Sequence, residues 1–251
     1  MAVKEFMEAR WKAIIGSVVT VVVAAALAGT YDLIKNLLVT GNATKQIPSQ
    51  LQGQIQQLMG SYDAYAWSQW FSKNGPEVLA ILAALLGASL IASEVNKGTI
   101  FFLLSKPVSR DRVLLTKYAV SALILLGVML LGGLALLAAA AIVGHAQNVG
   151  GVLISTVLLW LGMLFVLGLS MLFSVLFKDV LRPLVLALII PVVLSIPGLI
   201  PNVNDWNLTF YWSNFAAYQG TVFPLKELII CLVAAIVPVI IAIPLFRKQA
   251  Y

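Results

Sequence analysis

The chain has 251 residues, of which 61% are hydrophobic and only 10% are charged, and its formal net charge is +6. A soluble domain carries about 25% charged residues, so this composition excludes an ordinary water-soluble fold and predicts an integral membrane protein. The long apolar segments do not alternate with period two, which favours helical spans over barrel strands. The basic excess indicates Lys and Arg on the cytoplasmic side of a membrane rather than a nucleic-acid partner.

The first residues, 1–12, carry a pattern of their own. Two sets of residues recur every four positions on neighbouring helix faces, one polar (Lys4, Glu8, Lys12) and one apolar (Val3, Met7, Trp11). This spacing predicts an N-terminal amphipathic helix that lies in the membrane interface before the chain turns into the first span. The alternative is that residues 1–12 are simply the start of that span.

Six apolar segments are long enough to be membrane spans. They cover about 13–30, 77–93, 115–143, 152–177, 183–201 and 226–246. We therefore expect a single all-α, polytopic transmembrane domain over 1–251, with about six transmembrane helices. Between the spans, 31–76 and 202–225 are predicted to be outer segments, and 94–114 is predicted to be a cytoplasmic loop.

The orientation follows from the basic residues. All but four of the 16 (Lys35, Lys45, Lys73 and Lys226) fall in segments that share a side with the N-terminus. Since Lys and Arg accumulate in cytoplasmic loops, the chain is predicted to be a multi-pass protein of the cell membrane with both termini cytoplasmic.

A cleavable signal is the competing interpretation of the first apolar run. The run ends in the small-residue pattern 26–28, which resembles a cleavage site. The acidic residues Glu5 and Glu8 and the length of the run argue against a signal. Cleavage would leave the orientation of the other spans unchanged.

The predicted span cores hold no ionisable residue, which disfavours ion-coupled carriers and catalysis inside the membrane. The phosphate-binding pattern G-x-x-x-x-G-K-[ST] is missing from the sequence as well. The second span carries small residues four apart at Ala80, Ala84, Ala88 and Ala92. Such a stripe allows close helix packing, either against another subunit or against a neighbouring helix of the same chain.

The fifth span and the segment after it are unusual. Prolines at 183, 191, 197 and 201 predict a kinked or interrupted helix, because each removes a backbone donor and clashes with the preceding turn. The outer segment 202–225 is rich in aromatic residues (Trp206, Phe210, Tyr211, Trp212, Phe215, Tyr218, Phe223). It is either a re-entrant or interfacial hairpin or an ordinary aromatic belt.

The loop 94–114 contains five consecutive large apolar residues, Ile100 to Leu104. Five residues cannot cross a bilayer, so this run needs another cover, either the membrane interface or a cytoplasmic partner protein. Pro107 is expected to end the preceding helix, and Ser109 to cap the helix that leads into the third span.

The stretch "SEVNKGTIFFLLSKPVSRDRVLLTKY" resembles the signature loop of ABC-2 type exporter permeases. The matching positions are Glu94, Gly98, Thr99, the run Ile100 to Leu104, Ser105, Pro107 to Arg110 and Lys117. The resemblance implies a permease that acts as a dimer, expected to be a homodimer, and that binds separate ATPase subunits through this coupling helix.

The resemblance also implies specific roles within the loop. The residues expected to couple to the ATPase are Glu94, Lys97, Gly98, Thr99, Ile100, Phe101, Phe102, Leu103, Leu104, Pro107, Ser109 and Arg110. By analogy, the run Ile100 to Leu104 fills an apolar cleft of the ATPase, while Glu94 and Arg110 make charged contacts at its rim.

The remaining expectations concern the chain's partners. ATP and Mg²⁺ belong to the partner subunit, so this chain is expected to have no cofactor, no metal and no catalytic residue of its own. A second permease copy, the lipid bilayer and an extracytoplasmic accessory protein are the other partners considered. The alternatives to an exporter permease are a membrane scaffold or signalling partner without transport, and an ion-coupled carrier or channel.

Overall fold

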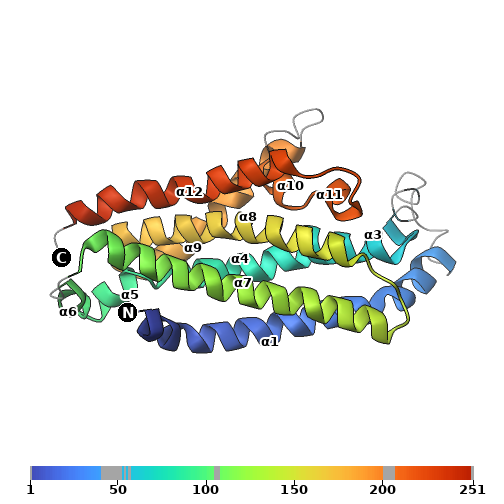
Figure 1. The fold of residues 1–251 in the computed structure, drawn as a ribbon, viewed down its shortest axis with the longest axis horizontal. Coiled ribbons are helices and arrows are strands. Elements are labelled where there is room, and N and C mark those ends of the chain that lie inside the picture. The colour runs from blue at the N-terminus through green and yellow to red at the C-terminus, as the bar shows by residue number, and fades with distance from the viewer. Residues whose placement is uncertain are drawn as a thin grey trace.

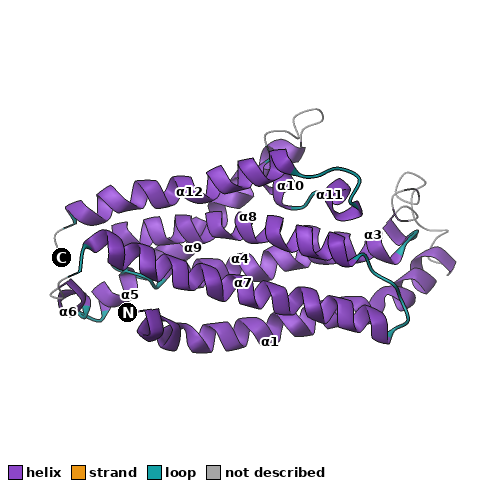
Figure 2. Ribbon diagram, in the orientation of Figure 1, coloured by secondary structure: helices purple, strands orange, loops and turns teal. Residues whose placement is uncertain are grey.

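The computed structural model describes residues 2–40, 53, 55, 58–104, 108–199 and 207–249. Within these ranges every regular element is a helix, and no strand occurs (Figure 2). The elements are α1 (Ala2–Lys35), η1 (Asn36–Thr40), α3 (Tyr62–Ala66), η3 (Trp67–Asn74), α4 (Gly75–Ala88), α5 (Ala92–Asn96), α6 (Ile100–Leu104), α7 (Arg110–Ile142), α8 (Val149–Leu176), α9 (Leu181–Ser195), η4 (Ile196–Leu199), α10 (Leu208–Trp212), α11 (Phe215–Gln219) and α12 (Leu225–Lys248).

Five helical segments are long and apolar enough to cross a membrane. They cover Val3–Leu38, Arg110–Ile142, Val149–Leu176, Leu181–Gly198 and Leu225–Lys248. The prediction of an all-α polytopic membrane protein is confirmed. Because lipid offers no hydrogen-bond partner to the backbone, helices that satisfy their own N–H and C=O groups are the expected spans.

The predicted second span, 77–93, is built differently from the other five. It corresponds to α4, which has 14 residues and continues without a break from α3 and η3, and which ends at Ala88. The Ser89 hydroxyl, just beyond, donates to the carbonyls of Leu85 and Leu86 at 3.1 and 2.9 Å. This back-bonding competes with the helix ladder, and the chain turns before α5.

The first helix corrects the expected boundary at residue 12. α1 runs as one helix of 34 residues, so residues 2–12 are its first turns and not a separate interfacial helix. The physical reason is local: no Gly or Pro occurs before Gly16, and Ala, Glu, Lys and Arg all favour continued helix. The structure therefore agrees with the alternative interpretation of this segment.

The long helices lie side by side along the long axis of the molecule, with α8 at the centre (Figure 1). α8 packs against α4, α7, α9 and α12. Two glycines allow this close packing: a Cβ on Gly87 of α4 would lie 2.6 Å from the Leu167 carbonyl oxygen, and a Cβ on Gly168 of α8 would lie 2.8 Å from Pro238.

The small-residue stripe of α4 faces this centre. Ala84, Ala88 and Ala92 are fully buried within the chain, and the Ser170 hydroxyl of α8 donates to the Ala84 carbonyl at 2.7 Å. Of the two interpretations of the stripe, the structure therefore favours contact with a neighbouring helix of the same chain.

The proline-rich span is interrupted as predicted. α9 contains Pro191 and gives way to the 3-10 turn η4, which contains Pro197, while Pro201 lies outside the described residues. Residues 207–223 then form α10 and α11, two short helices capped by Asn207 and Asn214. Their rings include the buried Trp212 and Tyr218, so this part of the aromatic segment packs against the bundle rather than forming only an exposed belt.

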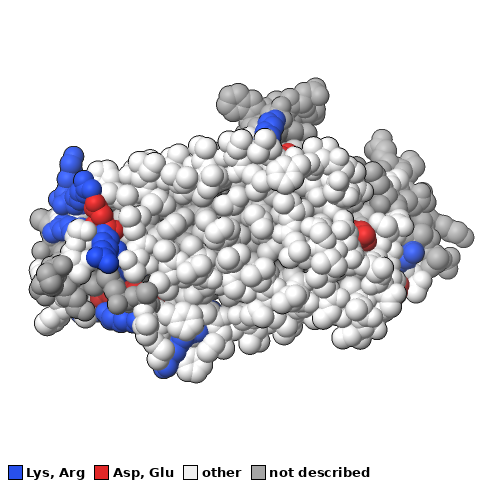
Figure 3. Space-filling model, viewed as in Figure 1, with Lys and Arg blue, Asp and Glu red and all other residues white. Residues whose placement is uncertain are grey.

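Charge separates the two ends of the molecule. Lys and Arg gather at the end where both termini, α5 and α6 lie, and a broad uncharged band covers the middle (Figures 1 and 3). We call this end, which carries Lys97, Arg110, Arg112, Lys178 and Arg247, the basic end. The end with α3, α10 and α11 is the opposite end.

Candidate functional site

The loop 94–114 lies at the basic end, and its first part is a tight helix–turn–helix. α5 ends at Asn96, and Gly98 in the turn that follows has a φ of +70°, in the left-handed region that favours glycine. The Thr99 backbone N–H donates to the Glu94 carbonyl at 2.9 Å, which closes the turn. The Gly98-Thr99 pair of the motif therefore has a structural reason: it reverses the chain between α5 and α6.

The apolar run of α6 is divided between the core and the surface. Ile100 is 2% exposed and belongs to a small core with Ile91, Leu114 and Phe246. Phe101 is 62% exposed and Phe102 is 76% exposed. Among the described side chains of α6, Ile100 therefore anchors the helix while Phe101 and Phe102 face outward.

The other predicted residues of the run are only partly described. The helix includes Leu103 and Leu104, but their side chains, and all of Pro107, lie outside the described residues. Ser109 behaves as expected: its hydroxyl accepts a hydrogen bond from the Arg112 backbone N–H at 3.3 Å and caps α7. Lys97 is exposed at the end of α5.

Arg110 is engaged within the chain. Its Nη1 donates to the backbone carbonyls of Phe246, Arg247 and Gln249 at 3.1, 3.3 and 2.6 Å. These are unsatisfied carbonyls at the end of α12, where a cation also complements the helix dipole. A second contact joins the same two helices, because Arg247 Nε of α12 donates a hydrogen bond to Asp111 of α7 at 2.8 Å. Arg110 therefore joins the start of α7 to the end of α12, a role that differs from the expected contact at a partner's rim.

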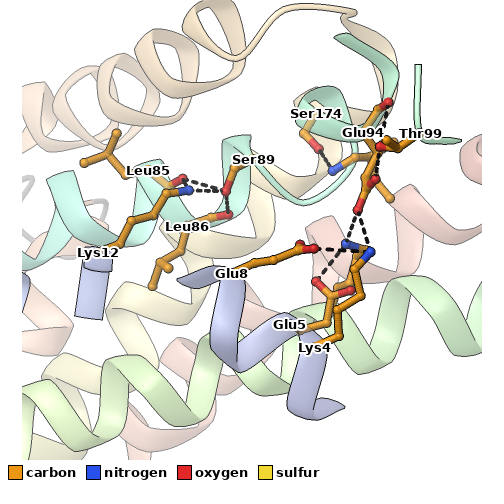
Figure 4. Close-up of polar contacts among 12 residues, drawn as sticks. Lys4, Glu5, Glu8, Lys12, Leu85, Leu86, Ser89, Glu94, Thr99 and Ser174 are labelled. Carbon is orange, nitrogen blue, oxygen red and sulfur yellow. Dashed lines mark hydrogen bonds and ion pairs between the residues drawn. The ribbon is translucent and has the colours of Figure 1, made fainter. Parts of the chain in front are cut away.

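Glu94 also points into the molecule. The Lys117 ammonium group lies 2.7 Å from Glu5 Oε2 and 3.2 Å from Glu94 Oε1, and the three side chains are 2%, 8% and 9% exposed. Lys4 lies 3.2 Å from Glu8 and 3.8 Å from Glu94 (Figure 4). This ion-pair network joins α1, α5 and α7.

The environment of Glu94 favours its charged form. Burial by itself raises the pKa of a carboxyl group, but the hydrogen bond donated by the Thr99 hydroxyl and the ammonium groups of Lys117 and Lys4 outweigh it, and the pKa of Glu94 lies below its usual range. A charged Glu94 is then compensated, as a buried charge must be.

A polar cavity of about 270 Å³ adjoins the network, between α1, α4, α5 and α7. Lys12 reaches into it and donates to Ser89 Oγ at 2.5 Å and to the Leu85 carbonyl at 3.2 Å. Carboxylate oxygens of Glu5, Glu8 and Glu94 lie within 4.8 Å of one another, a spacing that could hold a metal ion. The ammonium groups of Lys4 and Lys117 form ion pairs with these carboxylates, so the described side chains of this cluster make an ion-pair network.

Sequence reasoning missed the role of Glu5 and treated Lys117 only as a motif position. The available signal was a lysine at the very start of a predicted span, 115–143, because an ionisable residue next to the hydrocarbon region needs a partner. The choice of Glu5 as that partner could not be read from the sequence, since the two residues are 112 positions apart.

The comparison with known families agrees with the loop motif. A protein-family model described as "ABC-2 family transporter protein" matches residues 1–204. The chain belongs to the ABC-2 transporter family. The resemblance found in the loop is thus confirmed, and the chain is the multi-pass transmembrane permease of an ABC transporter. Comparison with curated proteins found no match.

The match includes the features that define the candidate site of this permease. The family region covers α1, which supplies Glu5, and continues through α5, α6 and α7 to the last described residues of η4. It leaves out α10, α11 and α12, so the contact of Arg110 with the end of α12 joins the family region to the remainder of the chain.

Proposed function

We propose that the permease is an exporter subunit that acts as a dimer and binds separate ATPase subunits through the loop 94–114. The observation that carries the proposal is the divided α6: Ile100 fixes the helix in a core, while Phe101 and Phe102 are exposed at the basic end. Exposed apolar surface rimmed by charge marks an interaction site. ATP and Mg²⁺ would be held by the ATPase and not by this chain.

The surface beside α6 supports a protein partner. A hollow of about 300 Å³ lies between α6 and the end of α8, and its lining includes Phe101, Phe177 and Lys178. An aromatic ring beside a hollow can insert into a partner while the hollow accepts a side chain of that partner. This arrangement occurs at the centre of well-packed interfaces. The exposed Lys178 supplies a basic group to its lining.

A path from this surface into the membrane follows from the described contacts. α5 is joined through Glu94 to Lys117 of α7 and, through that lysine, to Glu5 of α1. Movement of α5 and α6 on ATPase closure would therefore displace the basic ends of two spans, α1 and α7. Such rigid displacement of packed elements is a common way to transmit a conformational change.

The proposal for the dimer rests on the family resemblance. The Ala stripe of α4, one candidate for a subunit contact, is used by α8 of the same chain. Both termini are proposed to be cytoplasmic, with the basic end inside.

The test replaces Phe101 with Asp. We expect the F101D variant to lose co-purification with the ATPase and ATP-dependent transport, because a carboxylate cannot be desolvated against an apolar cleft. Phe223→Asp is the matched control, since Phe223 is 71% exposed at the opposite end. Equal ATPase co-purification by F101D, F223D and the wild type would contradict the proposed docking surface.

The orientation can be tested with the same protein. Cys231 is the chain's single cysteine and is buried. Labelling of a cysteine introduced by Lys97→Cys or by Lys226→Cys therefore shows on which side of the membrane that position lies. A membrane-impermeant maleimide added to intact cells should label K226C and leave K97C unlabelled until the cells are opened. The reverse pattern would overturn the proposed orientation.

A further inference from the structure

An apolar groove of about 780 Å³ runs between α1 and α7, on a face that none of the contacts above uses. α1 and α7 lie side by side over most of their length (Figure 1). The described residues that line the groove are all apolar except Ser17, and Val3, Phe6, Leu123 and Leu134 are 77%, 52%, 65% and 61% exposed. The groove is therefore open to the bilayer.

The length of the groove matches one leaflet. On α1 it extends from Val3 to Ser17, and on α7 from Val120 to Leu134, which at ~1.5 Å per residue is about 21 Å on each helix. Half of a bilayer is about 15 Å of hydrocarbon plus roughly 5–7 Å of headgroup layer. The groove is therefore long enough to hold part of an acyl chain below a headgroup.

A cation lies about halfway along the α1 side of the groove, roughly 10 Å from Val3. Arg10 is exposed and shares the α1 face of the groove, because positions 3, 6, 10, 13 and 17 follow helical spacing. Side chains on a helix lean toward its N-terminus, so the guanidinium group reaches back toward the basic end. It lies 5.7 Å from the centroid of the Trp11 ring, and such rings settle at the headgroup layer.

The middle of the groove is widened by a glycine. Gly127 is exposed, and a Cβ placed on it would meet no atom within 4 Å. A glycine in the interior of a helix costs about 1 kcal/mol relative to alanine, and no packing contact explains it at this position. The open notch gives an acyl chain direct contact with the α7 backbone.

We propose that this groove binds one phospholipid of the leaflet on the basic side, with its phosphate on Arg10 and an acyl chain along Gly127. Arg forms paired hydrogen bonds to phosphate, and this charge complementarity selects a phospholipid over a neutral glycolipid. The proposal needs only the embedding of the chain in a membrane and is independent of the ATPase-docking surface.

The test measures lipid binding to the purified full-length permease by native mass spectrometry. The probes are phosphatidylglycerol and a monogalactosyl diacylglycerol with the same acyl chains. Wild-type protein should form a one-lipid adduct with phosphatidylglycerol in preference to the glycolipid. Gly127→Leu fills the notch and should weaken both adducts by about tenfold, the effect of losing roughly two buried methylenes.

Two further variants make the test specific. Gly29→Leu is the matched control, because Gly29 is also an exposed glycine of a long helix with no atom within 4 Å of a Cβ, but lies outside the groove. It should bind both lipids as the wild type does. Arg10→Gln should weaken phosphatidylglycerol binding by about fivefold and leave glycolipid binding unchanged.

Three results would overturn the proposal. One is equal lipid binding by G127L and G29L. A second is wild-type binding of the glycolipid as tightly as phosphatidylglycerol. A third is a change in oligomeric state in G127L without any lipid adduct in the wild type, which would assign the groove to a second copy of the chain. Co-purification of the ATPase is expected to be unchanged in all three variants, which separates this inference from the proposed function.

Discussion

The two ends of the bundle are held together by different chemistry. At the basic end, formal charges join α1, α5 and α7 through Lys117, Glu5 and Glu94. At the opposite end, the Tyr218 hydroxyl donates to Asp63 at 2.7 Å, and the Asn148 side-chain amide donates to the Tyr218 carbonyl at 2.7 Å. Aromatic stacking adds to this second set.

The rings at the opposite end form a compact group. The His145 ring is stacked on Tyr62, with centroids 4.6 Å apart and planes 15° apart, and it meets Tyr31 edge-on at 5.1 Å. His145 Nε2 also lies 3.1 Å from Asp32 Oδ2. These contacts join the far end of α1 to α3 and to the turn between α7 and α8.

This difference in chemistry predicts which of the two ends can move. Attraction between charges falls slowly with distance, whereas hydrogen bonds weaken steeply with angle. After a small shift of α5, the partners of an ion-pair network therefore still attract one another. A network of directional hydrogen bonds and stacked rings loses much of its attraction after a shift of the same size. We expect the basic end to transmit movement and the opposite end to stay fixed.

The largest expected effect comes from the cation of the basic end. Lys117→Met leaves Glu5 and Glu94 buried without their main partner, and such a loss costs about 3–5 kcal/mol. The melting temperature of K117M in detergent should fall far below that of the wild type. The double variant K117M/E5Q should recover part of the loss, because one uncompensated charge is removed. A K117M protein as stable as the wild type would show that the network carries no stability.

A smaller effect is expected at the opposite end. Tyr218→Phe removes the hydrogen bond to the Asp63 carboxylate, a bond to a charged group worth about 1.5–3 kcal/mol. The melting temperature should fall, while co-purification of the ATPase should stay at the wild-type level. Loss of the ATPase in Y218F would contradict the assignment of a fixed, non-coupling role to this end.

The helix caps allow a matched comparison of the two ends. Ser109 caps α7 at the basic end and Ser61 caps α3 at the opposite end, each through its hydroxyl. Replacement of either by Ala should cost about 1 kcal/mol. Only S109A should also reduce ATPase binding in a pull-down, because it loosens the start of α7 beside α6. Equal pull-down by the two variants would remove Ser109 from the coupling surface.

The smallest effect is confined to acid. Since the pKa of Glu94 is lowered in the folded protein, its stabilisation is complete above the ordinary carboxyl pKa of about 4.5 and is lost as the pH falls through the folded value. The wild type should therefore lose melting temperature below about pH 4.5 more steeply than Glu94→Gln. Parallel curves for the two proteins would mean that Glu94 does not contribute to the acid response.

Several features could be predicted from the sequence because their causes are local. Apolar length predicts spans, proline interrupts α9, and a serine before a helical run predicts the cap at Ser109. The loop motif predicted the family, which the match over residues 1–204 confirms. The boundary expected at residue 12 was wrong, because amphipathic periodicity alone does not end a helix.

The sequence by itself determined that this chain is a helical membrane protein with a short apolar run on its basic side, because length, hydrophobicity and local backbone chemistry decide those properties. Only the tertiary structure decided which residues of the run face outward, that Glu94 meets Lys117 and Glu5, and that Arg110 holds the end of α12. These choices depend on side chains that are more than 20 positions apart in the sequence, and no local pattern records which distant groups the packing of helices will bring together.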